Sequence, residues 1–447
     1  MLEAVSHTRI KWYYASLATF VASLGVILFT LVEMRRGILF PLDTYRKLGS
    51  PSTLLYFDPW HLPLLLVGVL GAWLSYRWLT RLEGGLRGRA SHLKRLGNIL
   101  ALALMAVLVA DLFTYRIVPA RRIVGAGKIG VGRALPIDDM PAWLQPLGEA
   151  TNYFLLVWHA TALGILIGAL MLLLVARFLK PMLAGSGFRS HVAGAALAIP
   201  YPFCSCCAAP IGATLYRAGA SLGPALAFVV SAPMLNVTSL TLAVALLPAE
   251  FALLRIIGGV VVGAFVTYLV SWLASRWAGP PQPIARVRPR MALFSRVLER
   301  YSRLFRFEEF LQERAVDSPS ALISTWLALA GRLARVALPV LFLGAIAAAA
   351  VMEVLPSYSN NSVGVVVAAA LGTVLMIPTW TEIAIAGPLI KEGLDGPAAA
   401  FLITLPAVSI PCLAIISGAL NAYRAAFLLG LAVFAVGTMA GLLFLIV

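Results

Sequence analysis

The sequence has little charge and little cysteine for its length. Of its 447 residues, 12% are charged and 61% are hydrophobic, and the mean hydropathy is +0.91. So little polar surface cannot cover a water-soluble globule of this size. Four cysteines are also too few for a disulfide framework in a long chain. The composition therefore indicates an integral membrane protein.

Several catalytic signatures are missing as well. The sequence has no glycine loop for phosphate, no zinc-protease signature and no nucleophile elbow. We therefore expect neither enzymatic activity nor a bound cofactor. The net charge of +16 comes from basic residues in the short segments between apolar runs. That distribution follows the positive-inside rule and argues against a nucleic-acid partner.

Apolar runs of the length needed to cross a bilayer recur along the whole sequence. A helix needs about 20 such residues to cross about 30 Å of hydrocarbon. Because the runs are continuous and not alternating, they exclude a β-barrel. The predicted full spans are 12–32, 61–79, 97–118, 153–177, 221–247, 253–275, 336–355, 397–419 and 424–446.

Two further apolar stretches, 190–216 and 363–390, are interrupted by prolines and do not read as ordinary spans. The segments 80–95, 177–189 and 276–314 are rich in arginine and lysine, which places them in the cytoplasm. An even number of crossings must then lie between 189 and 276. The first stretch is therefore predicted to be a re-entrant hairpin, and the same parity gives a second hairpin that enters from the opposite side.

The two halves of this region also resemble each other. Residues 217–239, "RAGASLGPALAFVVSAPMLNVTS", align with 391–412, "KEGLDGPAAAFLITLPAVSIPC", matching Gly219 with Gly393 and Pro233 with Pro406. Similar units of opposite orientation, each with a broken segment, are typical of an inverted-repeat transporter. We predict an all-α polytopic membrane protein with two helical hairpins in an inverted-repeat core.

Four regions follow from this reading. They are a three-span N-terminal addition (1–150), a first permease repeat (151–275), a basic cytoplasmic linker (276–335) and a second repeat (336–447). Within the linker, 321–336 is interpreted as an amphipathic helix on the membrane surface, with the start of the next span as the alternative. The N-terminus is expected in the cytoplasm and the C-terminus outside.

Cys204, Cys206 and Cys207 lie together at the first helix break, in "IPYPFCSCCAAPIG". Irregular backbone at membrane depth is tolerated where it lines a cavity or is buried in protein. Soft thiols there could bind a thiophilic metal or metalloid transiently. Because adjacent cysteines on a regular helix point apart, Cys204 with either neighbour is the expected pair. The remaining cysteine, Cys412, aligns with Ser239 and is assigned to packing.

Three more residues are candidates around the breaks. Glu382 is an acid within the second broken stretch, where a charge is costly unless it is paired, hydrated or exchanging a proton. It is the candidate for proton coupling, and the alternative is that it caps a half-helix or pairs with a buried arginine. Asn236 and Trp380 are predicted to complete the wall of a substrate-binding cavity.

The segment "PFCSCCAAPIGATLYRAGASLGPALAFVVSAPMLN" resembles the ArsP/YraQ-type permeases, and "IPTWTEIAIAGPLIKEGLDGPAAAFLITLPAVSIP" looks like the matching repeat of that family. The resemblance covers roughly 150–275 and 320–447. It implies a bacterial plasma-membrane permease, and members with characterised activity export trivalent organoarsenicals. The paired thiols of the family correspond to Cys204 and Cys206, whereas Cys207 stands where many relatives have glycine.

These observations predict a secondary transporter that exports a small thiophilic substrate, most simply a trivalent organoarsenical, with proton coupling at Glu382. The expected partners are membrane lipid and the substrate, and a homo-oligomer is possible. The alternative is a membrane protein that exchanges disulfides or handles a soft metal such as copper. A third hypothesis is an assembly partner without transport of its own.

Overall fold

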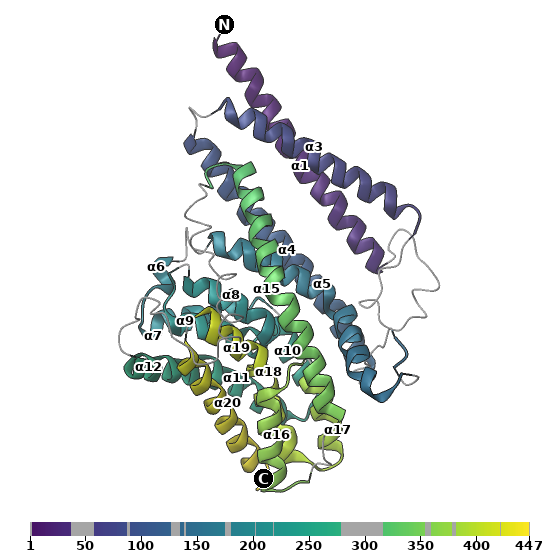
Figure 1. Ribbon diagram of the computed structural model, residues 1–447, viewed down its shortest axis with the longest axis vertical. Coiled ribbons are helices and arrows are strands. Elements are labelled where there is room, and N and C mark those ends of the chain that lie inside the picture. Colours follow the sequence, from purple (N-terminus) through teal and green to yellow (C-terminus); the bar gives the residue numbers. More distant parts are fainter. Residues whose placement is uncertain are drawn as a thin grey trace.

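The computed structural model of the protein describes most of the chain as helices. Within the described residues every regular element is helical, which confirms the all-α polytopic fold (Figure 1). Seven of the described helices are long and apolar enough to cross a membrane. The described residues are 2–36, 58–86, 90–126, 135–137, 140–174, 180–201, 203–217, 219–278, 316–353, 359–377, 381–420 and 422–446.

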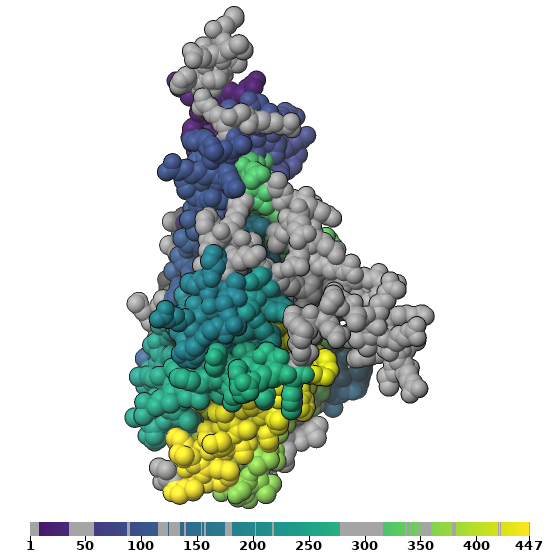
Figure 2. Space-filling model, turned by 90° about the vertical axis from the view of Figure 1, so that its left-hand side faces the viewer, coloured from purple at the N-terminus to yellow at the C-terminus, as the bar shows by residue number. Residues whose placement is uncertain are grey.

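Three helices form the N-terminal addition: α1 (Leu2–Arg36), α3 (His61–Gly84) and α4 (Ala90–Ala126). α1 and α3 pack along each other and project from one end of the molecule (Figures 1 and 2). The buried Glu83 carboxylate accepts hydrogen bonds from the hydroxyl of Tyr13 and from both the backbone N–H and the hydroxyl of Ser320. This contact joins the pair to the first turn of α15 (Pro319–Glu353).

The remaining helices form two series with the same order. After η2 (Ala142–Leu144), the first series contains α5 (Gln145–Leu174), α6 (Lys180–Leu183), α7 (Phe188–Ala198), α8 (Ser205–Arg217), α9 (Leu222–Met234), α10 (Val237–Leu246), α11 (Ala249–Val260), the π-helical segment η4 (Val261–Val266) and α12 (Thr267–Ala278). The second contains α15, α16 (Ser362–Val374), α17 (Thr381–Lys391), α18 (Asp395–Ala407), α19 (Ile410–Ala419) and α20 (Tyr423–Leu443).

Some corresponding parts of the two series also match in length. Six residues separate α7 from α8, and six separate α16 from α17. α9 and α18 each have 13 residues, and α10 and α19 each have 10. Gly219 and Gly393, paired by the sequence alignment, both adopt positive φ, 103° and 73°, in the turns before α9 and α18. This conformation is readily open to glycine because it has no Cβ.

The longest helices of the two series, α5 and α15, run in opposite directions. The Trp326 indole N–H donates to the carbonyl of Leu166 over 2.8 Å, whereas the ring of Phe342 packs on Phe154 with centroids 5.4 Å apart. Residue numbers therefore rise along α15 as they fall along α5. Equivalent helices of opposite direction are what an inverted repeat requires.

One expectation for this region is wrong. Residues 321–336 do not form a separate surface helix but begin α15, as the alternative interpretation proposed. The apolar face of this segment is buried against protein, with Trp326, Leu329 and Leu333 nearly inaccessible. An amphipathic pattern is satisfied equally by a lipid surface and by a neighbouring helix, so the pattern alone could not separate the two.

The predicted spans 221–247 and 397–419 are each interrupted by a break of two residues. The first break is Leu235 and Asn236, and the second is Val408 and Ser409. Pro233 and Pro406 lie in the last turn before these breaks. A proline there removes a backbone donor and weakens the continuation of the helix. α9 and α18, which lead into the breaks, are almost wholly buried, as are Asn236, Val408 and Ser409, so protein surrounds this irregular backbone.

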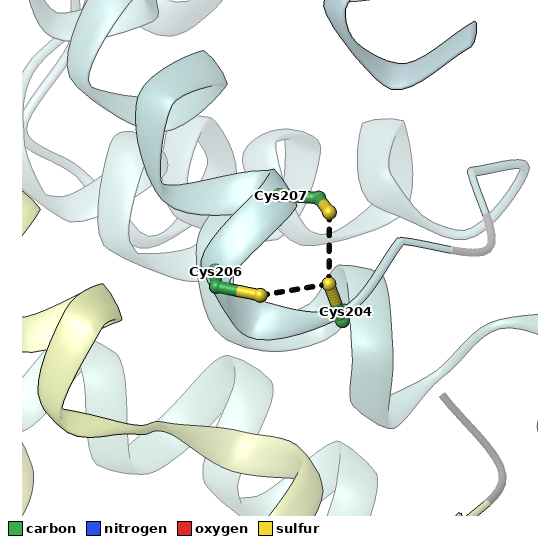
Figure 3. A group of neighbouring side chains, drawn as sticks. All are labelled: Cys204, Cys206 and Cys207. Atoms are coloured by element: carbon green, nitrogen blue, oxygen red, sulfur yellow. Dashed lines mark hydrogen bonds between the residues drawn. The ribbon is translucent and has the colours of Figure 1, made fainter. Parts of the chain in front are cut away.

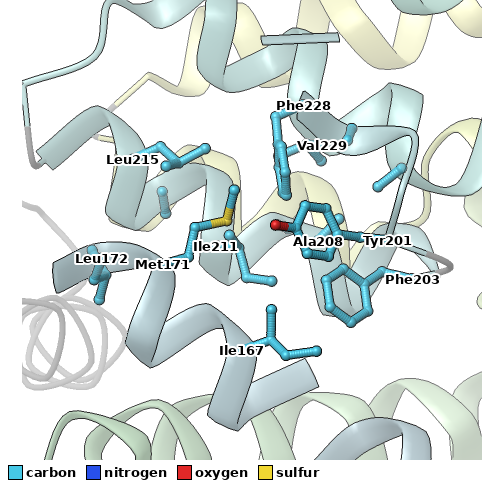
Figure 4. Packing of buried hydrophobic residues seen from close by; sticks show 14 of the residues in the cluster. Ile167, Met171, Leu172, Tyr201, Phe203, Ala208, Ile211, Leu215, Phe228 and Val229 are labelled. Carbon is cyan, nitrogen blue, oxygen red and sulfur yellow. The ribbon is translucent and has the colours of Figure 1, made fainter. Parts of the chain in front are cut away.

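A large apolar cluster surrounds α8 and the residues just before it. Ile167 and Met171 of α5 face Ile211 of α8 and Phe228 of α9, with Tyr201 and Phe203 stacked beside them (Figure 4). Within a bilayer these side chains stabilise the fold through close van der Waals packing, because lipid tails are as apolar as the side chains themselves. At Gly168 an added Cβ would come within 2.8 Å of Ile211, so this glycine permits the close approach of α5 to α8. α8 is thus a packed part of the core.

Candidate functional site

The three clustered cysteines converge at the start of α8. Cys204 is the last residue before the helix, and its carbonyl accepts hydrogen bonds from the N–H groups of Cys207 and Ala208. Its Sγ lies 2.9 Å from Sγ of Cys206 and 2.8 Å from Sγ of Cys207 (Figure 3). The three sulfurs all lie within 4.8 Å of one another, and none of the three cysteines is in a disulfide.

The expected pairing of Cys204 with either neighbour therefore describes the geometry well. Cys206 and Cys207 point in different directions from adjacent helical positions, and Cys204 reaches between them from the preceding loop. Cys206 is fully buried, Cys204 is nearly so, and Cys207 is half-buried. Such a convergence of soft donors suits a thiophilic ion or metalloid better than a hard cation.

The thiols face the second repeat. Cys204 and Cys206 pack with Leu341 and Ala345 of α15 and with Met376, which follows α16. The hydroxyl of Ser205, the first residue of α8, lies 3.3 Å from the hydroxyl of Ser409 in the break before α19. α19 itself packs on α8. The tip of the first hairpin thus meets the helix break of the opposite repeat.

A second junction, meaning a contact between a helix start of one repeat and the broken helix of the other, lies at the start of α17. Glu382 in the first turn of α17 accepts a 2.9 Å hydrogen bond at Oε1 from the hydroxyl of Ser239 in α10. The same oxygen lies 3.2 Å from Nη2 of Arg255 in α11, and both side chains are almost completely buried. The alternative interpretation of Glu382, a pair with a buried arginine, describes this contact. Proton coupling at Glu382 stays a prediction.

Arg255 also donates hydrogen bonds to backbone carbonyls of α9. Its Nη1 donates to the carbonyl of Met234 over 2.8 Å, and its Nη2 donates to the carbonyl of Pro233 over 3.0 Å. These carbonyls belong to the last turn of α9, whose acceptors the helix leaves unused. The guanidinium therefore donates hydrogen bonds to the carbonyl end of α9. Its positive charge also pairs with Glu382 at the start of α17 in the other repeat.

Asn236 is placed as the N-cap of α10, and its amide group is occupied there. Its Oδ1 accepts hydrogen bonds from the N–H of Ser239 at 2.7 Å and from the hydroxyl of Thr238 at 3.2 Å. Its Nδ2 donates to the carbonyls of Ala232 and Pro233. These contacts assign Asn236 to holding the break, while its predicted contact with substrate stays a prediction. Trp380 lies outside the described residues.

The thiol junction, at the start of α8, and the carboxylate junction, at the start of α17, lie next to each other. A cavity of about 10 Å³ separates them, which is close to the lower limit for a single water. Cys204 and Glu382 line it at the starts of α8 and α17, and Pro233 and Pro406 line it from the last turns of α9 and α18. One thiol, the carboxylate and the last turns before both breaks thus lie around one small cavity.

Two contacts of this region were not found from the sequence. Arg255 was not singled out, although a lone arginine inside the apolar run 253–275 is a usable signal. In addition, Oδ2 of Asp111 in α4 lies 3.1 Å from Nε2 of His159 in α5. That pair joins α4 of the N-terminal addition to the core, and no local pattern records a contact between residues so far apart in sequence.

Comparison with known proteins covers this part of the chain. Residues 149–446 match the sequence profile of the ArsP_1 family, described as "Predicted permease". The UPF0718 protein YraQ of Escherichia coli strain K12 is 31% identical over 314 residues, which cover 68% of this chain and 82% of that protein. The UPF0718 protein MJ0584 of Methanocaldococcus jannaschii is 25% identical over 287 residues, covering 54% and 77%. No solved structure matches the chain.

Proposed function

Because the chain belongs to the ArsP_1 family of predicted permeases, and is therefore a multi-pass membrane permease, we propose that it exports a trivalent organoarsenical bound at Cys204 and Cys206 or Cys207. The observation that supports the proposal is the convergence of three thiols at a helix break, where residues of both repeats pack around them. In inverted-repeat transporters the site lies where such breaks meet, near the middle of the bilayer.

The chemistry of binding is a reversible exchange. In a dihydroxy species R–As(OH)₂, two As–O bonds are replaced by two As–S bonds, and each thiol proton leaves with a hydroxyl group as water. No oxidant or reductant is needed. Two thiolates hold such a substrate, and water reverses the exchange on release. The half-buried Cys207 and the buried Cys206 each lie beside Cys204, so either pair can bind in this way.

Glu382 is proposed to take up a proton as access alternates. In the closed state its charge is balanced by Arg255. If the carboxylate is protonated, the guanidinium still has the carbonyls of Pro233 and Met234 as acceptors, and the Ser239 hydroxyl lies 3.4 Å away. The hairpin that carries Glu382 could then separate from α11 without leaving a buried cation with no partner, which would be costly.

The test is uptake of trivalent methylarsenical into inverted membrane vesicles under an imposed proton gradient. We expect accumulation by the wild type, loss with Cys204→Ser/Cys206→Ser, and loss of the response to the gradient with Glu382→Gln. Glu392→Gln is the matched control, because Glu392 is an exposed acid at the end of the same hairpin and should leave uptake unchanged. Failure of the wild type to accumulate the arsenical would contradict the proposal.

The same variants address disulfide exchange or copper handling. Either activity would require the cysteines, but neither requires a proton at Glu382. An activity lost with the cysteine variant and fully retained in Glu382→Gln would therefore favour those functions over proton-coupled export.

A further inference from the structure

A groove lies between α1 and α3 of the N-terminal addition, and it contains none of the residues proposed to act in transport. Its volume is about 530 Å³, within the range of about 300–1,000 Å³ that is usual for ligand sites. The lining residues all come from these two helices: Trp12, Ala15, Ser16, Thr19, Gly71, Leu74, Ser75, Arg77, Trp78 and Arg81. Their spacing of three and four residues places them on one face of each helix.

The groove is basic and aromatic at one end and uncharged at the other. Trp12 of α1 and Trp78 of α3 contact each other at the first end, with ring centroids 5.8 Å apart. Arg81 lies in the last turn of α3 and Arg77 lies one turn earlier, and both are exposed. From Gly71 to Arg81 the groove extends about 15 Å along the helix.

The uncharged end offers few hydrogen bonds to a ligand. The Thr19 hydroxyl donates to the carbonyl of Ala15 over 2.9 Å. The Ser75 hydroxyl donates to carbonyls of the preceding turn of α3. Leu74 is exposed beside them. Because these hydroxyls are satisfied within their own helices, this part of the groove suits an aliphatic chain better than a polar ligand.

The basic end can bind an anion. Among the side chains that the structure describes, no acid pairs with Arg77 or Arg81. Arg77 lies over the ring of Trp73, 4.7 Å from its centroid, which fixes its position without using its charge. Glu83 is about 200° from Arg81 around the helix and accepts hydrogen bonds from Tyr13 and Ser320 on that other side. Two arginines one turn apart can bind one phosphate group together.

The order of these features matches the order of groups in a membrane lipid. The arginine end adjoins the basic segment 80–95, which the positive-inside rule places at the cytoplasmic face. Anionic lipids give that face a negative surface potential, and basic pockets between helices there bind lipid headgroups. Tryptophan is enriched at the level of the headgroups, and acyl chains lie deeper. Arginine, tryptophan and uncharged side chains follow each other along the groove in this sequence.

We infer that the groove binds an anionic phospholipid, with its phosphate at Arg77 and Arg81 and one acyl chain along the uncharged part. The lipid would contact both α1 and α3 at the end that Glu83 joins to α15. It touches neither the thiols nor Glu382, so the inference is independent of the proposed function.

The test is native mass spectrometry of the purified full-length protein in detergent, titrated with phosphatidylglycerol or with phosphatidylcholine of the same acyl chains. We expect the wild type to bind phosphatidylglycerol more tightly. Arg77→Gln/Arg81→Gln should weaken that binding about 30-fold, because each arginine near an anionic lipid surface is worth about a factor of five. Equal affinity of the wild type for the two lipids, or unchanged binding of phosphatidylglycerol by the variant, would overturn the inference.

Two exposed arginines outside the groove provide the matched control. Arg276 lies over Trp272 at 3.9 Å, and Arg424 lies over Tyr423 at 5.6 Å. Arg276→Gln/Arg424→Gln removes the same charge from the protein and should leave phosphatidylglycerol binding at the wild-type level. A loss equal to that of Arg77→Gln/Arg81→Gln would show that net charge, and not the groove, attracts the lipid, which would overturn the inference.

A third variant tests the acyl chain. Ala15 is exposed and lines the groove, so Ala15→Trp fills it while both arginines remain. We expect weaker binding of phosphatidylglycerol by this variant, and no competition from glycerol phosphate, which has the charge of the headgroup but no chains. Unchanged binding by Ala15→Trp, or displacement of the lipid by an equal concentration of glycerol phosphate, would overturn the assignment to a phospholipid.

Discussion

Arg255 and Glu382 come from opposite repeats and form an ion pair with Nη2 and Oε1 3.2 Å apart, with almost no exposure of either side chain. Removal of one partner from a buried pair costs about 3–5 kcal/mol, because the other charge stays buried without compensation. We therefore expect Arg255→Gln to lower the thermal unfolding temperature of the purified protein strongly.

The double variant Arg255→Gln/Glu382→Gln separates the pair from its other contacts. Because neither position is then charged, it should recover part of the stability lost in Arg255→Gln, a coupling of about 0.5–3 kcal/mol. Additive losses in the two single variants and the double variant would show that the pair contributes no interaction energy.

The thiol geometry predicts that the three cysteines are unequal. Cys204 is within 3 Å of both other sulfurs, whereas Cys206 and Cys207 each have their short contact with Cys204. Cys204→Ser should therefore weaken retention of a trivalent arsenical the most, and Cys206→Ser or Cys207→Ser should each leave one short pair intact. Competition with a dithiol, followed for each purified variant, measures the order. Cys207→Ser as the most damaging change would contradict it.

Variants of Asn236 can distinguish a structural role of its side chain from a role in binding substrate. Loss of an N-cap side chain costs about 1 kcal/mol, so Asn236→Ala should lower stability. Asn236→Ser should be tolerated better, because serine can cap a helix and Ser409 stands at the equivalent break. We expect transport per folded molecule to be unchanged in Asn236→Ser. A large loss of transport with normal stability would assign Asn236 to the substrate.

The topology predicted from charge can be measured by labelling. Single cysteines introduced at Ser302, in the basic linker, and at Ser359, which is exposed before α16, are treated with a membrane-impermeant maleimide in intact cells. We expect reaction at residue 359 and none at 302 until the cells are opened. The unsubstituted protein gives the background from Cys207. Reaction at 302 in intact cells would place the linker outside.

Much of the architecture could be predicted from local sequence. Pro200 and Pro202 mark the first interruption, and the paired glycines Gly219 and Gly393 mark equivalent turns because their backbone conformation favours glycine. The clustered cysteines are close in sequence, so their convergence could be predicted from the sequence. The Arg255–Glu382 pair spans 127 residues, and which arginine would reach the acid depends on how the repeats pack.

The equal lengths of the interrupted helices have an electrical consequence. α9 and α10, with 13 and 10 residues, measure about 20 Å and 15 Å, which together are enough to cross the hydrocarbon of a bilayer. Glu382 contacts the first turn after the break, so it lies roughly halfway through this thickness. Moving one charge across the whole membrane potential is worth about 2.3 kcal/mol per 100 mV. If Glu382 takes up a proton during transport, as proposed, a proton that reaches it from either face passes through about half of the membrane voltage.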